Sequence, residues 1–278
     1  MKRNYIARRF QLGGTGLSLD TEALSKYKDI IDLSIGDTDF TTDEAIIAAA
    51  FRDAGLGHTH YGDPKGDPEL ISAVCRAWEE DFGQPLSDDH VLVSTSSCLG
   101  MALTMLAILD PGDEVIVFSP YFAVYRSQIE LAGGVCVDVP TYADENYAID
   151  EARLRAAITP RTKAIIFNNP ANPTGMSYDR GTLSMLARIA QEYDLLIAAD
   201  EIYTTYLYEG DFCPIRTLPG MAERTITLNS FSKNYLMTGW RVGVIIAEPE
   251  LLAVMNRING ALVYTAPSIS QRAAIQAL

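Results

Sequence analysis

The stretch KAIIFNNPANPTG, residues 163–175, joins an apolar run to a polar, proline-rich loop. The run Lys163–Phe167 is short, unalternating and rich in Ile, as expected of a strand that is buried on both faces. The loop Asn168–Gly175 places amide side chains directly after that strand. Because ligand sites in parallel sheets form outside the carboxyl ends of the strands, this stretch predicts a parallel sheet and a site at its edge.

Short apolar runs separated by helical patterns continue from about residue 90 onward. The runs are Val91–Ser94, Glu114–Phe118, Val135–Val139, Lys163–Phe167, Leu195–Ala199, Thr225–Leu228 and Val242–Ala247. The helical patterns are Leu99–Leu109, Phe122–Ala132, Asp150–Ile158, with Asp150 as its N-cap, and Tyr178–Tyr193. This alternation predicts an α/β fold with three αβα layers and a mostly parallel seven-stranded sheet.

The two ends of the chain have other patterns. Residues 1–35 are expected to form an arm and a short helix that lead into a strand at Ile30–Ile35. Thr42–Phe51 and Pro68–Phe82 are expected to be helical. The last segment, Gln271–Leu278, has the pattern of a helix interior without a stop signal, so we expect the chain to be a fragment of a longer protein.

Composition restricts the class of protein. The net charge of −14 leaves no excess of Lys and Arg to neutralise phosphates, which argues against a nucleic-acid partner. The four cysteines show no C-x-x-C spacing and the three histidines no ligand spacing, so we expect no disulfide framework and no metal site. No stretch approaches the roughly 20 apolar residues of a membrane span, and the first residues lack the apolar run of a signal peptide. We expect a cytoplasmic protein with no membrane partner.

Two further stretches place reactive groups after predicted strands. Asp200–Tyr203 (DEIY) follows the fifth run, and Ser230–Lys233 (SFSK) follows the sixth, with Gly239–Arg241 (GWR) shortly behind. A lysine at such an edge can form a Schiff base with an aldehyde. The planar guanidinium of an arginine matches two phosphate oxygens, and a carboxylate at the end of an apolar strand is costly unless it is paired. The residues alone also allow a surface lysine, a salt-bridge arginine and a capping aspartate.

At these residues the sequence resembles the class I/II aminotransferases, the fold-type I enzymes that use pyridoxal 5′-phosphate (PLP). The resemblance runs from about Ile31 to the last residue, and S-x-S-K followed by M-T-G-W-R-x-G is its most specific part. It implies that Lys233 binds the PLP aldehyde and that Asp200 pairs with the pyridinium nitrogen. Tyr203 and Asn172 would donate to the phenolate oxygen of the ring and keep the lysine linkage reactive near neutral pH. Asn172 taken alone would be a turn residue before a proline.

The resemblance also implies a set of residues around the ring and phosphate. Arg241 and Ser230 would bind the phosphate, and Phe122 would stack on the ring. Tyr121 and Tyr125 are alternatives for the stacking role, and a core aromatic is the other interpretation of Phe122.

Ser97 and Cys98 would offer backbone amides to the phosphate at a helix N-terminus. The family usually has two small residues before a polar one there, so Ser96-Ser97-Cys98 departs from its pattern. A small buried apolar residue is the other interpretation of Cys98. One bacterial aspartate-aminotransferase subgroup has a lysine at the position of Cys98, and its absence argues against that mode of aspartate recognition.

Two residues of the first part complete the implied site. Gly36 would let the backbone contact the α-carboxylate of the substrate, with an ordinary turn glycine as the alternative. Tyr61 lies in the pattern Y-x-x-x-x-G-x-P-E-L, which implies a tyrosine that reaches the phosphate of a partner subunit. The resemblance therefore implies a homodimer with a shared active site, whereas a locally packed loop tyrosine is the alternative.

The function implied by the resemblance is transfer of an amino group from an L-amino acid to a 2-keto acid. Residues 1–36 would be an N-terminal arm and small-domain segment, and residues 37–278 the PLP-binding large domain. The C-terminal small domain, which carries the arginine for the substrate α-carboxylate, would be absent. Two alternatives remain open: a PLP-dependent lyase that carries out C–S β-elimination on amino acids, and a truncated PLP-binding module without transaminase activity.

Overall fold

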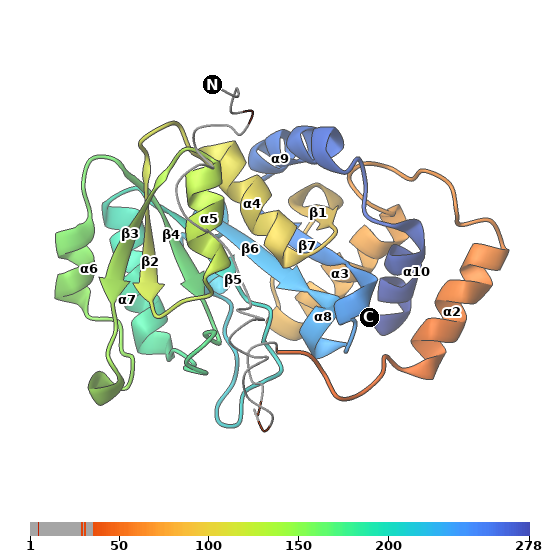
Figure 1. The fold of residues 1–278 in the computed structure, drawn as a ribbon, viewed down its shortest axis with the longest axis horizontal. Coiled ribbons are helices and arrows are strands. Elements are labelled where there is room, and N and C mark those ends of the chain that lie inside the picture. Colours follow the sequence, from red (N-terminus) through yellow and green to blue (C-terminus); the bar gives the residue numbers. More distant parts are fainter. Residues whose placement is uncertain (1–4, 6–28, 30, 32–35) are drawn as a thin grey trace.

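The computed structural model describes Tyr5, Asp29, Ile31 and residues 36–278, drawn as the coloured ribbon in Figure 1. The predicted arm, short helix and Ile30–Ile35 strand lie outside the described residues, apart from those three isolated positions.

A seven-stranded sheet forms the centre of the molecule, with strand order β1-β7-β6-β5-β4-β2-β3. The strands are β1 (Val91–Ser94), β2 (Glu114–Ser119), β3 (Val135–Pro140), β4 (Thr162–Asn168), β5 (Leu196–Asp200), β6 (Thr225–Ser230) and β7 (Gly243–Ile246). Strands β3, β2, β4, β5 and β6 pair in parallel, while β7 is antiparallel to both β6 and β1. The predicted α/β fold with a mostly parallel seven-stranded sheet is confirmed.

The strand directions bring six chain segments to one edge of the sheet. Because β7 runs against both of its neighbours, β1 has the same direction as the parallel strands. The carboxyl ends of β1, β2, β4, β5 and β6 therefore meet at the edge where β7 begins. Each predicted site segment from residue 96 onward adjoins this edge, and the carboxyl edge is where ligand sites form in parallel sheets.

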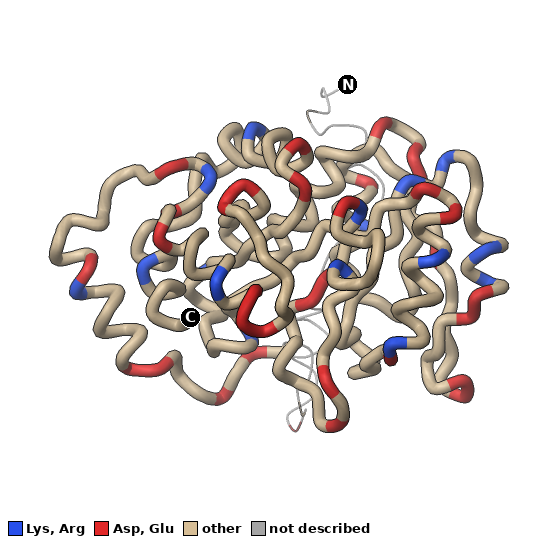
Figure 2. Tube along the Cα trace, turned by 180° about the vertical axis from the view of Figure 1, so that it is seen from behind, with Lys and Arg blue, Asp and Glu red and all other residues tan. Residues whose placement is uncertain are grey.

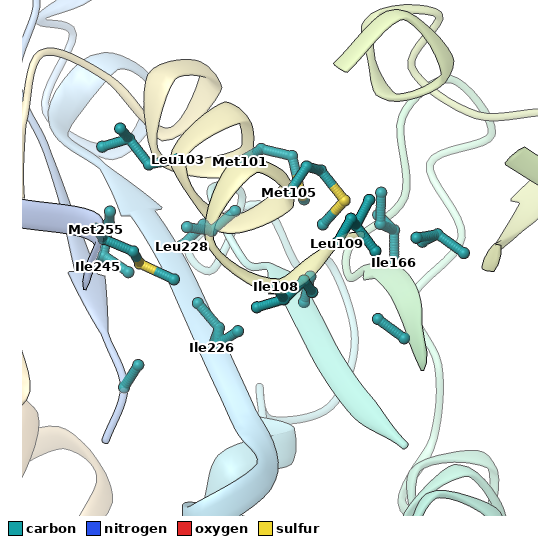
Figure 3. Packing of buried hydrophobic residues seen from close by; sticks show 14 of the residues in the cluster. Met101, Leu103, Met105, Ile108, Leu109, Ile166, Ile226, Leu228, Ile245 and Met255 are labelled. Atoms are coloured by element: carbon teal, nitrogen blue, oxygen red, sulfur yellow. The ribbon is translucent and has the colours of Figure 1, made fainter. Parts of the chain in front are cut away.

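One face of the sheet is covered by α4 (Ser97–Ile108), α5 (Val124–Leu131) and α9 (Pro249–Leu262). Figure 3 shows that Met101, Met105 and Ile108 of α4 belong to the buried apolar cluster on this face of the sheet. On the sheet side, Leu228 of β6 and Ile245 of β7 are completely buried in the same cluster. The central helix therefore has little exposed surface, and its N-terminus is fixed relative to the strand ends.

The other face is covered in two parts. Helices α6 (Glu151–Ala157) and α7 (Arg180–Glu192) pack over the β2–β5 half, and α3 (Pro68–Phe82) and α10 (Ser268–Ala277) over β1 and β7. Helix α2 (Glu44–Gly55) packs on α10 at the edge of the molecule. A four-residue helix, α8 (Phe231–Asn234), follows β6 directly. A short 3-10 turn, η4 (Ile215–Thr217), packs on the same face of the sheet as α6 and α7.

The helix boundaries differ from the expectations by a few residues. The side chain of Asp150 accepts from Arg153 N, so the predicted N-cap of α6 is confirmed. Helix α5 begins at Val124 instead of Phe122, because residues 120–123 form the irregular connection from β2. Helix α7 begins at Arg180, where Asp179 caps it by accepting from Thr182 N. Helix α9 was not predicted at all.

Acidic and basic positions alternate along the described chain without a large block of one sign, as Figure 2 shows. Within residues 36–278 no helix is both long and apolar enough to cross a membrane.

Candidate active site

A cleft of about 730 Å³ opens at the edge of the sheet where the strand ends meet. Its walls come from the segments that follow β1, β2, β4, β5 and β6, from the segment before β7, and from residues 36 and 37. The predicted site residues that line it are Gly36, Ser97, Cys98, Phe122, Asn172, Asp200, Tyr203, Ser230, Lys233 and Arg241. Of the predicted set, only Tyr61 lies elsewhere.

Asp200 is the last residue of β5 and is only 7% exposed. Its Oδ2 atom accepts a hydrogen bond from Tyr125 OH at 2.5 Å. Its buried Oδ1 atom has no hydrogen-bond partner among the described residues. Burial raises the pKa of Asp200 to about 6, against the opposing effects of the Tyr125 hydrogen bond and of the nearby backbone N–H of Ile202. A buried acceptor without a partner is costly, so Asp200 favours a ligand that offers it an N–H group.

The loop after β4 is held to the end of β5 by Asn168. Its Nδ2 donates to Asp200 O at 2.8 Å, and its Oδ1 accepts from Asn172 N at 2.6 Å. Burial and the charge of Asp200 raise the pKa of the Tyr203 phenol, while the side chain of Asn172 lowers it. Asn172 and Tyr203 thus lie close together above the carboxylate. Asn168 was missed as a site residue, although it stands at the strand end that the sequence predicts.

Lys233 lies in α8, which the side chain of Ser230 caps by accepting from Ser232 N at 3.1 Å. Ser230 Oγ itself donates to Ser232 Oγ at 2.9 Å. The Lys233 Nζ donates to the carbonyl oxygen of Gly36, which lines the same cleft. The structure therefore places Gly36 and Lys233 in direct contact.

Arg241 precedes β7 and adopts a left-handed backbone conformation with φ of 57°. This region is unfavourable for a residue with a side chain, so the surrounding structure must enforce it. The guanidinium donates from Nη1 to Thr238 O at 2.8 Å, and Thr238 Oγ1 donates to Asp37 Oδ1 at 2.9 Å. Arg241 is exposed to the cleft, and among the described residues its guanidinium bonds to a carbonyl oxygen and to no carboxylate, which leaves it available to an anion.

The N-terminus of α4 lines the same cleft as Arg241. Ser96 caps the helix by accepting from Leu99 N at 3.1 Å, and Ser97 and Cys98 form its first turn. A Cβ atom on Gly243 would lie 2.9 Å from both Ser96 C and Ser97 N. The absence of a side chain at Gly243 therefore lets the start of α4 sit directly on the sheet, where its first turn lines the same cleft as Arg241.

Cys98 is exposed on the wall of the cleft, so its interpretation as a buried apolar residue was wrong. Cys98 is the second residue of α4, so it belongs to the first turn of a helix that begins at the cleft and not to the buried sheet. Gln128 of α5 donates to Cys98 O at 2.7 Å and fixes this turn. The enclosing walls and the charge of Asp200 raise the pKa of the thiol, and Arg241 lowers it.

The three aromatic residues that follow β2 make different contacts. Phe122 lines the cleft and packs edge-to-face on Tyr125, with ring centroids 5.6 Å apart. Tyr125, which the sequence offered only as a stacking alternative, is instead bonded to Asp200. Tyr121 also lines the cleft and lies near Cys136 Sγ through its hydroxyl, at 3.7 Å.

Tyr61 does not line the cleft. It is 87% exposed and packs edge-to-face on Tyr264, with centroids 5.2 Å apart. Within the part of the chain that the structure describes, no three His, Cys, Asp or Glu side chains are grouped so as to hold a metal ion.

Comparison with known proteins identifies the family. The family profile described as aminotransferase class I and II matches residues 28–278, so the chain belongs to this family. It is 39% identical to the aspartate/prephenate aminotransferase of Thermus thermophilus over 90% of this chain and 64% of that protein. It is 36% identical to an arginine–pyruvate transaminase of Pseudomonas aeruginosa over 96% of this chain and 68% of that protein. The chain thus spans about two thirds of the length of these relatives.

Comparison with solved structures also finds aminotransferases. The aspartate aminotransferase of Thermus thermophilus with maleate superposes with a TM-score of 0.93 at 35% identity, covering 99% of this chain and 73% of that one. The aspartate aminotransferase of Thermotoga maritima gives a TM-score of 0.91 at 33% identity, covering 98% of this chain and 74% of that one.

Proposed function

We propose that the cleft binds pyridoxal 5′-phosphate and that the protein is an aminotransferase. The observation that carries the proposal is the buried Oδ1 of Asp200, which lacks a partner among the described residues in a cleft that also contains Lys233 and Arg241. A protonated pyridine nitrogen is the N–H donor that this carboxylate needs. The family profile, which covers residues 28–278, supports the same cofactor.

Each part of the cofactor has a candidate partner in the cleft. Lys233 Nζ is the amine for the aldehyde, and Tyr203 and Asn172 are the donors for the phenolate oxygen. Arg241, the hydroxyl of Ser230 and the amides of Ser97 and Cys98 would hold the phosphate. Phe122 would cover one face of the ring. The Tyr125 hydrogen bond lowers the pKa of Asp200 and so favours the ionised carboxylate that a pyridinium requires.

When bound, PLP supplies an electron sink that lets a bond to the α-carbon of an amino acid break. The protein provides the geometry and the proton transfer. Lys233 Nζ, once free of the aldehyde, is the base that takes the proton from the substrate α-carbon. Gly36, whose carbonyl oxygen already contacts Lys233 Nζ, would position the substrate α-carboxylate beside the same amine. The hydrogen bond from Tyr125 holds Asp200 in a fixed orientation throughout.

The substrates would be an L-amino acid and a 2-keto acid. Cys98 places a neutral thiol at the α4 terminus, and no lysine stands there to meet a second substrate carboxylate. We also propose a homodimer in which Tyr61 reaches the phosphate of the partner's PLP, because this exposed side chain has no role in its own cleft. Residues 37–278 would form the PLP-binding large domain, and residues 1–36 an arm and small-domain segment. The free cysteines suit the cytoplasm.

A half-reaction tests the proposed activity. The PLP-loaded protein is mixed with a panel of L-amino acids without any keto acid, and the cofactor is extracted and separated. We expect pyridoxamine phosphate and one equivalent of the matching keto acid, with re-formation of PLP when 2-oxoglutarate is added. Release of pyruvate and ammonia with the cofactor unchanged would contradict transamination.

A further inference from the structure

The segment that carries Tyr203 has no regular secondary structure of its own. Residues 202–205 form successive turns between β5 and η4. Within the segment, Tyr206 N donates to Tyr203 O at 2.9 Å, and the two rings pack edge-to-face with centroids 5.9 Å apart. The position of the Tyr203 phenol over the cleft therefore depends on what holds these turns to the rest of the molecule.

Side-chain hydrogen bonds join the turns to α8, the helix of Lys233. Asn234 Nδ2 donates to Thr204 Oγ1 at 2.7 Å, and Thr205 Oγ1 donates to Asn234 Oδ1 at 2.9 Å. A third bond runs from Tyr206 OH to Lys233 O at 3.1 Å. Both ends of the Asn234 amide are thus occupied, each by a hydroxyl of the Tyr203 segment.

These contacts lie away from the cofactor cleft. Asn234, Thr204 and Thr205 line a second cavity of about 120 Å³, which shares Ser230 with the cleft of Lys233, and none of the three lines that cleft. The amide therefore touches neither the proposed cofactor nor the proposed substrate. The residues that line the cleft are next to this contact on the chain. Lys233 directly precedes Asn234, and Tyr203 directly precedes Thr204.

We propose that Asn234 is a positioning residue that sets the distance between the Lys233 amine and the Tyr203 phenol by clamping Thr204 and Thr205 to α8. Helix α8 has only four residues, so its own backbone bonds give little resistance to rotation. A bidentate amide clamp supplies that resistance, because two hydrogen bonds from one planar group fix an orientation as well as a distance. The inference rests on the proposed binding of PLP.

The test follows the visible absorbance band of the PLP-loaded protein through a pH titration, together with the rate at which PLP dissociates. In Asn234→Ala we expect the titration midpoint to rise by roughly half a pH unit, because a displaced Tyr203 stabilises the phenolate less. PLP should dissociate up to about tenfold faster, as expected for the loss of one or two hydrogen bonds. A purely structural residue would change the melting temperature without moving the titration midpoint.

Matched variants separate the hydroxyl contacts from side-chain volume. The double variant T204V/T205V removes both hydroxyls with little change in shape and should reproduce the shift, whereas T204S/T205S keeps them and should titrate as the wild type does. Adding Asn234→Ala to T204V/T205V should cause no further shift, because both changes break the same clamp. If Asn234→Ala does not fold, the valine and serine pairs alone give the answer.

Two results would overturn the inference, and they differ from each other. A wild-type titration midpoint and a wild-type PLP dissociation rate in T204V/T205V would show that the clamp does not position Tyr203 relative to Lys233. The proposed binding of PLP would be unaffected by that result. A wild-type protein that forms no visible band with PLP would overturn the proposed function and this inference with it.

Discussion

Asp200 and Glu201 are adjacent buried acids with different surroundings. Asp200 accepts from Tyr125, whereas Glu201 is 1% exposed and accepts from Ile215 N at 3.1 Å through Oε1. The Oε2 atom of Glu201 has no hydrogen-bond partner among the described residues. Burial raises the pKa of Glu201 to about 8, with a further contribution from the Asp200 charge, and that of Asp200 to about 6. Asp200 thus ionises first, as its proposed role with a pyridinium requires.

These raised pKa values predict how the stability of the cofactor-free protein changes with pH. Between about pH 5 and pH 8 the folded protein retains protons that the unfolded chain has released, so its free energy of unfolding falls as pH rises. Carboxyls with lowered pKa values, such as Glu114, change the free energy of unfolding only at lower pH, where they become protonated. Glu201→Gln keeps the acceptor for Ile215 N and should remove a large part of this fall, on the order of 1 kcal/mol or more.

Urea unfolding of the cofactor-free protein at pH 5.5 and pH 8, roughly the ends of that window, measures the difference. Glu80→Gln, on the exposed face of α3, is the control and should retain the wild-type slope. An equal slope in the Glu201→Gln variant and the wild type would show that Glu201 does not hold its proton in this range.

At the scale of elements, the close contact between α4 and β7 positions the proposed phosphate site. The backbone at Ser96–Ser97 approaches Gly243 so closely that a Cβ atom there would lie 2.9 Å from it and from Asn229 O. Backbone atoms on both sides give such a Cβ atom no room, so Gly243→Ala should push the N-terminus of α4 off the sheet. We expect PLP affinity to fall by about tenfold or more, because the amides of Ser97 and Cys98 lose their alignment with Arg241.

Gly260→Ala is the matched control for this element. Gly260 lies in α9, where an added Cβ atom has nothing within 4 Å. A helical Gly→Ala change should leave PLP affinity unchanged and stabilise the protein by about 0.5–1 kcal/mol. Equal PLP dissociation constants for the Gly243→Ala variant and the wild type would contradict the role given to this contact.

At the scale of the whole molecule, the sheet gathers groups from residues 36 to 241 into one cleft. The sequence predicts the strands, because unalternating apolar runs identify doubly buried strands, and strand ends identify Asp200 and Lys233. It does not predict the reversed direction of β7, since that run is as apolar as the parallel ones. The Tyr125–Asp200 bond spans 75 residues of sequence and the Asn234 clamp about 30. Such pairings depend on tertiary packing, for which a single sequence carries no local signal.

The proposed function requires that Lys233, Asp200 and Arg241 surround one PLP molecule, which is joined to the lysine. The most direct measurement is reduction of the PLP-treated protein with borohydride, followed by proteolysis and mass spectrometry of the labelled peptide. We expect one phosphopyridoxyl group per chain, on Lys233, and loss of that label in the Lys233→Ala variant. A label spread over surface lysines, or retained in full by Lys233→Ala, would contradict it.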